Sequence, residues 1–568
     1  MGRVALAAAR RALGLEEPVR RMARIPLALA FALLVLSTAC QGGGQGTGQR
    51  QSSGAPREQV VRLPTTEPPT LDPGLAADAT SIDVISQLFE GLVTFDDQGA
   101  VHPVEAEAWQ VSDDGRQYTF RLREGLRWSD GQPVTAHDYE YAWKRNVDPR
   151  TASDYANALY PILNAQRIHK QGADPNTLGV RAVDDRTLVV QLEEPAAYFL
   201  RLASTWTLFP LPRWAIERGG DSWTEAGKIV TNGPFKLESW RHDQDLTLVR
   251  NDDYWGSKPT LVRAVYKIFP DGAEEQMLAA YEAGEIDLST TNYRLPPAQV
   301  ERLRNDPKLK NELHLFPASD TRFITVNHRR PALRDRRVRE ALGIAIERER
   351  LLRDVLKRPG QPATSLQPEG IAGRKPELWP KEDVQRAKQL MAEAGYPDGR
   401  GFPEITFTYN TADVWKALAQ YLQQRWKDTL GITVRLDNME WKVFLKWKFE
   451  PGWTERGDLY RGGWVSDYED PNNWYNMLWD SAEDPTQFNG GWKNDEYDAL
   501  VRRARGEQDP AARTALYEQA EALLARDYIH IPINYERYEV LVKPYVQNYA
   551  PPRVMGNTPL TKMAIATQ

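Results

Sequence analysis

Apolar and polar residues alternate along several short stretches of the chain, with the two-residue period of half-buried β-strands. Two such stretches carry their apolar residues at Tyr118, Phe120 and Leu122 and at Leu188, Val190 and Leu192. Between them, Thr135 is a typical N-cap residue for a helix that runs to about Asn146. From Val60 onward, strand and helix patterns alternate without a solenoid-type repeat, which predicts a mixed α/β architecture.

The second half of the chain carries longer helical patterns. Apolar residues recur every three or four positions over residues 335–356, which predicts one long amphipathic helix. Further on, the pattern predicts in order a helix at 382–394, a strand at 405–409, a helix from 413 to about 427 and a strand from 432 to 436. This β-α-β unit predicts parallel strands, and sheets of that kind bind ligands beyond the carboxyl ends of their strands.

A short stretch after this unit, residues 461–471 (RGGWVSDYEDP), combines two glycines, two aromatic residues and several acids. We expect a loop here, in which Gly462 and Gly463 would let a ligand's main chain come close. The aromatic rings would supply apolar walls, and Asp467 would meet a positively charged group. The alternative is a solvated acidic turn, since Asp, Gly and Pro are common turn residues. On these residues alone both interpretations stay open.

Length and charge restrict the class of protein. A chain of 568 residues is too long for one hydrophobic core, so roughly two to four domains are expected. Apolar residues make up 41% of the chain and charged residues 26%, as in folded globular proteins. The formal net charge is -6 and the basic residues are dispersed, so we expect no nucleic-acid partner.

The single cysteine, Cys40, follows an apolar run at residues 25–39 that has the length of a signal-peptide core, with three arginines before it. Small residues precede Cys40, as in a bacterial lipoprotein lipobox, although Ser37 stands where that pattern usually has Leu. We expect a signal peptide at 1–39, lipidation of Cys40, and a Gly/Gln/Ser-rich flexible tether at 40–58. An ordinary signal peptide with an unrelated cysteine is the alternative. Acidic residues at 16 and 17 indicate that Met22 is the true start.

Catalytic patterns are missing from the sequence. It contains no Gly-x-Ser-x-Gly elbow, no His-Glu-x-x-His motif and no Walker loop, and its seven histidines are scattered. A carboxylate pair such as Asp467 and Asp470 would suit a glycosidase, but such pairs are common in a chain with 78 acidic residues. We therefore predict no catalytic residues, no metal ligands and no cofactor, and a protein that binds without chemistry.

Several short motifs occur in an order that resembles the oligopeptide-binding proteins of bacterial ABC importers, a branch of solute-binding protein family 5. They are TLDP at 70–73, LFEGL at 88–92, WSDGQPVTA at 128–136, DPRTAS at 148–153, NGPF at 232–235, DRRVREA at 335–341 and VKP at 542–544. The stretch at 461–471 matches that family's peptide-site signature. The resemblance covers nearly the whole chain from Val60 onward.

The resemblance implies a type II periplasmic-binding fold, in which two α/β lobes joined by a hinge close on a ligand, with the extra domain of the peptide-binding branch. Lobe I would comprise residues 59–89, 212–317 and 538–568. Extra domain II would comprise residues 90–211, and lobe III residues 318–537.

The resemblance also implies the ligand-binding residues. Asp467 would pair with the α-ammonium of a peptide, and Arg461 with the C-terminal carboxylate of a short one. The remaining candidates would contribute main-chain approach or pocket walls: Gly462, Gly463, Trp464, Val465, Trp441, Tyr155, Tyr254 and, from lobe I, Ala79.

The expected function is extracytoplasmic capture of oligopeptides and their delivery to an ABC permease whose ATPases are separate chains. We expect a monomer, anchored to the membrane through Cys40 in the cell envelope. One alternative is the same fold with a non-peptide ligand, such as a nickel chelate, haem or an oligosaccharide. Another is a secreted hydrolase.

Overall fold

The computed structural model describes residues 57–96, 101–291, 293, 295–358, 360–369, 371, 374–449, 452–481, 486–551 and 558–566. The predicted signal peptide, Cys40 and nearly all of the 40–58 tether lie outside these residues. Within the described part of the chain, no helix has the length and apolar character needed to cross a membrane.

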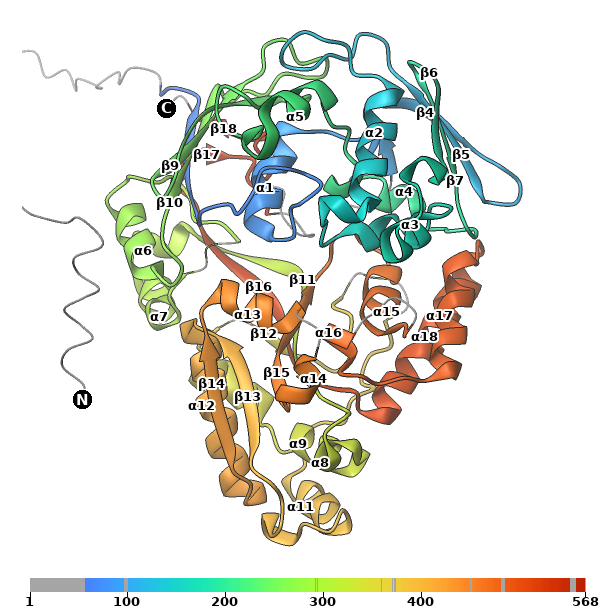
Figure 1. The fold of residues 1–568 in the computed structure, drawn as a ribbon. Helices are drawn as coiled ribbons and strands as arrows, with labels where there is room; N and C mark the ends of the chain where they lie inside the picture. The colour runs from blue at the N-terminus through green and yellow to red at the C-terminus, as the bar shows by residue number, and fades with distance from the viewer. Residues whose placement is uncertain are drawn as a thin grey trace, which may run out of the picture. The chain divides into compact units, whose positions relative to one another are not determined.

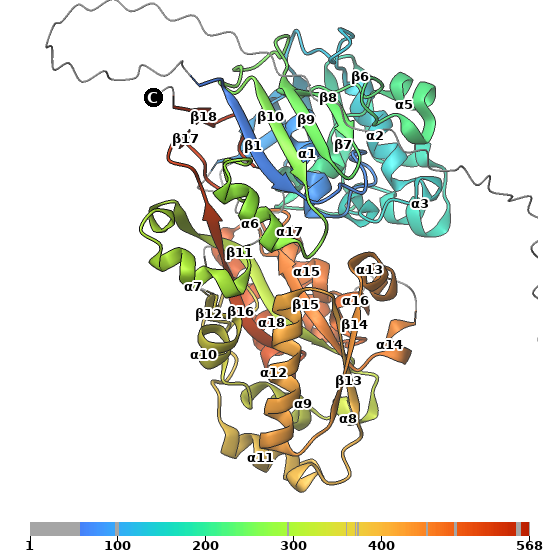
Figure 2. The same cartoon turned by 90° about the vertical axis from the view of Figure 1, so that its left-hand side faces the viewer.

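A four-stranded sheet, here called the lobe I sheet, has the order β1-β10-β9-β8 (Figure 2). Its strands are β1 (Val60–Thr65), β10 (Arg263–Ile268), β9 (Asp245–Arg250) and β8 (Phe235–Arg241). The β1 and β10 strands pair in parallel and the other neighbours are antiparallel. Three helices belong to the same part of the chain: α1 (Ala79–Leu88), α6 (Glu274–Glu282) and α7 (Pro297–Asn305).

A second, antiparallel sheet, the domain II sheet, has the order β4-β5-β7-β6. Its strands are β4 (Ala106–Val111), β5 (Gln117–Leu122), β7 (Thr187–Gln191) and β6 (Val180–Asp184). The two predicted alternating strands are confirmed as β5 and β7. The predicted helix is confirmed as α2 (Ala136–Val147). A capping box formed by Thr135 and Asp138 stabilises its N-terminus. The short helix α4 (Phe199–Leu202) also belongs to this region.

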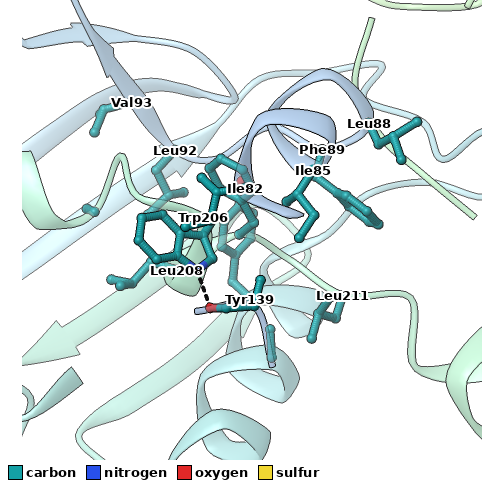
Figure 3. Close-up of a cluster of buried hydrophobic side chains, with 14 of the residues drawn as sticks. Ile82, Ile85, Leu88, Phe89, Leu92, Val93, Tyr139, Trp206, Leu208 and Leu211 are labelled. Carbon is teal, nitrogen blue, oxygen red and sulfur yellow. Dashed lines mark hydrogen bonds between the residues drawn. The ribbon is translucent and has the colours of Figure 1, made fainter. Parts of the chain in front are cut away.

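The lobe I and domain II segments share one hydrophobic core. Figure 3 shows Ile82 of α1 beside Trp206, and Ile85, Leu88 and Leu208 belong to the same buried cluster. The Trp206 indole donates a hydrogen bond of 3.0 Å to the carbonyl of Ala76. Because large apolar side chains from both segments are buried in one cluster, the two segments are held together as one body.

The third sheet, the lobe III sheet, has six strands in the order β12-β16-β11-β15-β13-β14 (Figure 1). Its strands are β12 (Gly360–Pro362), β16 (His530–Leu541), β11 (Leu313–Val326), β15 (Leu459–Val465), β13 (Ile405–Asn410) and β14 (Val434–Met439). Its helices include α9 (Arg336–Ile344), α10 (Arg348–Arg350), α11 (Val384–Glu393), α12 (Asp413–Leu430), α13 (Trp441–Phe449), α15 (Asn472–Trp479), α17 (Asp495–Gly506) and α18 (Pro510–Asp527).

The predicted β-α-β unit is confirmed, because β13 and β14 pair in parallel and α12 connects them. The single long helix predicted over 335–356 is wrong. The chain leaves the α-helix after Ile344, resumes in α10 and continues as a π-helix over Leu351–Leu356. The buried guanidinium of Arg348 donates hydrogen bonds to the carbonyls of Pro532 (2.7 Å) and Gly343 (3.3 Å), which fixes the break.

The predicted loop at 461–471 is also partly wrong. Residues 461–465 belong to strand β15, which lies inside the sheet between β11 and β13. Only residues after Val465 form a turn, which leads into α15. The sequence predicts a loop because two glycines normally weaken a strand. Side chains on the neighbouring strand β11 explain why glycines occupy these positions.

The two longest strands contain the predicted boundaries of lobe III. The boundary at 317/318 falls within β11, and the boundary at 537/538 falls within β16. These strands pair with each other, and their register shifts between Pro317 and Thr321. The lobe boundaries themselves stay predictions.

Candidate functional site

Strand β15 explains the glycine pair. A Cβ atom on Gly462 would lie 2.6 Å from the ring of Phe323 and 2.7 Å from the Thr325 hydroxyl on the neighbouring strand β11. A Cβ atom on Gly463 would lie 3.0 Å from a guanidinium nitrogen of Arg322. Gly462 is therefore needed for packing inside the sheet, and Gly463 leaves room for Arg322 to lie across the strand.

The turn after β15 holds Asp467 in a fixed position. The main-chain N–H of Asp467 donates to Oδ1 of Asn473 (3.0 Å), and Nδ2 of Asn473 donates to Oδ2 of Asp467 (3.0 Å). The Trp464 indole donates to the same Oδ1 (2.9 Å). Asn473 lies in α15, so one amide side chain binds both the Trp464 indole and the acid. The Trp464 ring is buried against Phe488, and its role as a pocket wall stays a prediction. Sequence reasoning missed Asn473, which has no motif of its own.

The other oxygen of this carboxylate, Oδ1, is not satisfied within the described part of the chain. Asp467 is 7% exposed, and its Oδ1 makes no hydrogen bond with any described residue. Burial raises the pKa of Asp467 to about 7, and only the hydrogen bond from Asn473 opposes that rise. A buried carboxylate with an unsatisfied oxygen is suited to a cation supplied from outside the protein.

Two other segments reach the same place. Burial raises the pKa of Tyr155, and the charges of Asp467 and Asp78 raise it further, so both acids lie near this hydroxyl. Asp78 caps α1 by accepting hydrogen bonds from the main-chain N–H groups of Thr80 and Ser81, at 3.0 Å each. Ala79, the predicted contact from lobe I, begins this helix. Tyr155, Asp78 and Asp467, from three distant parts of the sequence, thus interact electrostatically.

Arg461 lies under a layer of aromatic rings. Its guanidinium carbon is 4.8 Å from the ring centroid of Trp441, 5.0 Å from that of Trp415 and 5.3 Å from that of Phe444. Burial lowers the pKa of Arg461 to about 9, with a further contribution from the charge of Arg322. The predicted wall residue Trp441 therefore contacts Arg461 directly. Sequence reasoning missed Trp415, which lies in the first turn of α12.

A cavity of about 200 Å³ is lined by Trp415, one of the rings that contact Arg461. Trp415, Arg322 and Asn410 line it from the lobe III sheet and α12. Thr66, Glu274 and Tyr293 line it from the lobe I segments, so both predicted lobes form its walls. Asp467 is not one of the lining residues.

The cavity and Asp467 are related through strand β15. Arg322 in the cavity wall is in register with Gly463, which precedes Asp467 by four residues. The four residue steps from Gly463 to Asp467 span at most roughly 13 Å along the chain, and the step across to Arg322 on the neighbouring strand adds about 5 Å. Val465, the last residue of β15, lies between them. Arg461 thus lies within β15, and Asp467 lies in the turn that follows the strand.

Tyr254 belongs to a different environment. Its hydroxyl donates to Oε2 of Glu90 (2.6 Å), and its ring packs against Trp255 at 5.5 Å. Burial raises the pKa of Glu90 to about 7 and that of the neighbouring Glu105 to about 8. Among the described residues, the polar contact of Tyr254 is to this buried acidic network, and a role as a pocket wall stays a prediction.

No group of three His, Cys, Asp or Glu side chains in the described residues is arranged to hold a metal ion. The site is built instead from aromatic walls, an incompletely paired acid and arginines. Such a constellation holds a ligand by charge and shape and offers no nucleophile with an adjacent base. The fold and the site together define a solute-binding protein.

Comparison with known proteins identifies the family. Residues 100–486 match the bacterial extracellular solute-binding proteins, family 5, and the chain belongs to that family. It is 36% identical to the probable deoxycholate-binding periplasmic protein YgiS of Escherichia coli, over 87% of this chain and 91% of that protein. It is 35% identical to the periplasmic oligopeptide-binding protein OppA of the same organism, over 90% and 93% respectively.

Two solved structures of one relative, the murein tripeptide-binding protein MppA of Escherichia coli, differ in their similarity to this fold. The first superposes with a TM-score of 0.78 and 32% identity, covering 90% of this chain and 99% of that one. The second, described as the unliganded open form, has a TM-score of 0.67 and 31% identity, covering 90% and 98%. The type II periplasmic-binding fold is confirmed by these similarities.

Proposed function

We propose that this protein captures oligopeptides between lobes I and III and delivers them to an ABC permease. The observation that carries the proposal is the buried carboxylate of Asp467, whose Oδ1 has no hydrogen-bond partner among the described residues. The α-ammonium of a peptide supplies a cation and hydrogen-bond donors of the size that this oxygen accepts. The named function of OppA supports the same interpretation.

The rest of the site suits an extended peptide. An extended chain advances about 3.3–3.6 Å per residue, so a peptide of several residues anchored at Asp467 would extend along β15 toward the cavity lined by Arg322. Strand β13 pairs with β15 only at Leu459 and Tyr460, so main-chain pairing of a peptide with residues 461–465 on that side would give affinity independent of sequence. Trp464, Trp441 and Tyr155 would form the walls of side-chain pockets. Arg461, at the far end, is the proposed partner of the carboxylate of a short peptide.

A non-peptide ligand is the competing proposal, because one relative is named as a probable deoxycholate-binding protein. Deoxycholate is an anion with a sterol body and has no ammonium group. A ligand carboxylate at Asp467 would place a second negative charge beside that acid, and one bound at Arg461 would leave Oδ1 of Asp467 without a cation. The chemistry of Asp467 therefore favours peptides with a free amino terminus.

The setting of the protein is part of the proposal. Relatives named as periplasmic support an extracytoplasmic location. We propose further that Cys40 carries a lipid that holds the protein at the membrane surface, that the protein acts as a monomer, and that it catalyses no reaction. Mass measurement of the protein purified from its native membrane would test the lipid, since diacylation adds a defined mass to Cys40.

The decisive experiment combines identification of the natural ligand with a blocked-terminus control. Mass spectrometry of material released from the purified protein should show a series of short peptides. Calorimetry should then show that tri-alanine binds and that N-acetylated tri-alanine binds at least tenfold more weakly, because the acetyl group removes the ammonium. Recovery of a steroid acid, or equal affinity for both peptides, would overturn the proposal.

A further inference from the structure

The turn that carries Asp467 is also a contact point with domain II. Arg201 of α4 donates a hydrogen bond of 2.7 Å from its guanidinium to the main-chain carbonyl of Glu469. The Nε atom of the same side chain lies 3.9 Å from Oδ2 of Asp470. These residues are separated from Arg201 by more than 260 positions, so the contact joins domain II to the turn in lobe III.

Asp470 is fixed from the lobe III side. It is 4% exposed, and the guanidinium of Arg513 on α18 donates to both of its carboxylate oxygens, at 2.6 and 2.9 Å. Oδ1 of Asp470 also accepts a hydrogen bond from the main-chain N–H of Asn472 (2.9 Å), next to the Asn473 that holds Asp467. Asp470 therefore connects the two arginines to the turn that carries the acidic site.

Two further contacts accompany Arg201. The rings of Tyr198 and Tyr468 stack with centroids 6.3 Å apart and planes 5° from parallel. The main-chain N–H of Ala197 donates to the carbonyl of Arg505 at 3.3 Å. Domain II therefore meets lobe III along residues 195–201, on one side of the Asp467 turn.

The comparison with MppA indicates how the lobes of this protein are arranged in the structure. The two structures of that relative have nearly equal coverage and identity, yet the unliganded open form superposes with a TM-score of 0.67 against 0.78 for the other. The contacts between domain II and lobe III thus belong to an arrangement unlike the open form. Since domain II shares its core with lobe I, opening the lobes would separate Arg201 from the turn.

We propose that Arg201 is a positioning residue that couples lobe closure to the peptide-binding turn. It is placed to bind the Glu469 carbonyl only when domain II reaches lobe III, and it then holds the segment on which Asp467 lies. Closure and ligand capture would stabilise each other through this contact. The proposal deepens the proposed function and rests on it for the identity of the ligand only.

The geometry offers a direct probe of closure. A Cβ atom on Gly506 of α17 would lie 4.0 Å from the Cβ of Pro195, within the range of about 3.5–4.5 Å that a disulfide needs. The double variant Pro195→Cys, Gly506→Cys, made in a Cys40→Ser chain, has no other cysteine. The rate at which this pair oxidises therefore reports how often domain II and lobe III meet.

The test compares Arg201→Gln with Arg201→Lys and with Arg213→Gln in this double-cysteine chain. Arg213 lies in the same region, and its side chain is 64% exposed and pairs with Glu217, so it is a matched charge control. At saturating tri-alanine we expect Arg201→Gln to slow oxidation and to raise the dissociation rate about tenfold, as for one lost charge-assisted hydrogen bond. Arg201→Lys should fall between, and Arg213→Gln should match the parent.

A merely structural role for Arg201 would give a different result. The melting temperature of the reduced, ligand-free Arg201→Gln variant should equal that of the parent, because the contact is absent when the lobes are open. Unchanged oxidation and dissociation rates, or a lowered melting temperature with unchanged rates, would overturn the proposal. If tri-alanine fails to bind the parent, the proposed function fails, and the coupling is then judged on ligand-free oxidation, which Arg201→Gln must still slow.

Discussion

At the scale of single residues, Asp467 and Gly462 show how differently two members of one motif act. The sequence indicates an acid suited to a cation, and the structure adds that one of its oxygens has no hydrogen-bond partner in the part of the chain that the structure describes. The glycines are predicted from sequence as an approach for ligand, whereas Gly462 is required by the ring of Phe323 on the next strand. That requirement could not be predicted, because Phe323 is distant in sequence and only the sheet brings it close.

Replacement of the acid tests its role in binding. Asp467→Asn should cost about 2–5 kcal/mol of peptide affinity, the range for losing one partner of a buried charge pair. The exposed Asp495 of α17 offers a control, and Asp495→Asn should bind as the parent does. Calorimetry with tri-alanine measures both variants, and equal affinities for all three proteins would contradict the assignment.

The raised pKa of Asp467 predicts proton release on binding. With a pKa of about 7, this carboxyl is partly protonated near neutral pH in the free protein, and a bound ammonium favours its ionised form. Affinity should therefore rise as the pH is raised from about 6 towards 7.5, and the binding enthalpy near pH 6.5 should vary with the ionisation enthalpy of the buffer. Asp467→Asn should abolish this buffer dependence, whereas its persistence would place the proton elsewhere.

The glycine pair gives a graded prediction for folding. Gly462→Ala places a methyl group 2.6 Å from a packed ring, and overpacking of this kind costs about 1–3 kcal/mol. In Gly463→Ala the nearest atom, at 3.0 Å, is the end of the flexible Arg322 side chain, so the cost should be smaller. Urea denaturation measures both. A larger loss in Gly463→Ala would contradict this account of the sheet.

At the scale of elements, prediction from sequence succeeds where the pattern is local and fails where a distant contact decides. Strands β5 and β7, helix α2 and the parallel β13–α12–β14 unit follow from periodicity and capping. The helix at 335–356 keeps its apolar period but breaks, because Arg348 turns to the carbonyl of Pro532 in β16. Strand β15 could not be recognised from the sequence, because glycines are unusual inside strands. The cavity lined by Trp415 could not be predicted from the sequence either, because its walls come from both lobes.

The break in that helix can be tested through Arg348. Arg348→Met removes the guanidinium donor from the carbonyls of Pro532 and Gly343, of which Gly343 keeps the main-chain N–H of Ile346 (3.3 Å), and this should lower the free energy of unfolding by about 1.5–3 kcal/mol. Arg350, in the same short helix, is 60% exposed and pairs with Glu347. Arg350→Met should therefore change the free energy of unfolding by less than about 1 kcal/mol. Equal effects in urea denaturation would show that the buried hydrogen bonds are unimportant.

At the scale of the whole molecule, a buried histidine links stability to pH. His530 is fully buried among Phe323, Trp379 and Trp479, and neither ring nitrogen has a hydrogen-bond partner among the described residues. Burial lowers its pKa from 6.5 to about 3, and the nearby His328 contributes. Between about pH 3 and pH 6.5, the pKa values of the folded and unfolded states, the unfolded chain binds the proton more readily. The stability that the neutral imidazole allows is therefore present above about pH 6.5 and is lost as the pH falls.

Replacement of this histidine should therefore flatten the acid side of the stability profile. His530→Phe keeps an aromatic ring in the cage but cannot take up a proton, so its free energy of unfolding should fall less between pH 6.5 and 4 than that of the parent. His314 is exposed, and His314→Gln should keep the parental slope. Urea denaturation at several pH values compares the three proteins, and parallel profiles for His530→Phe and the parent would exclude this explanation.

The aromatic cover of Arg461 has an optical consequence. Indole emission depends on nearby charge, and Trp415 and Trp441 both lie within about 5 Å of the guanidinium. An anionic group that settles on Arg461 would change the field at these two rings while most of the other tryptophans stay in their own surroundings. A difference spectrum between the parent and Trp415→Phe would isolate that signal without any label. The protein thus carries its own fluorescent reporter for the end of the site that is remote from Asp467.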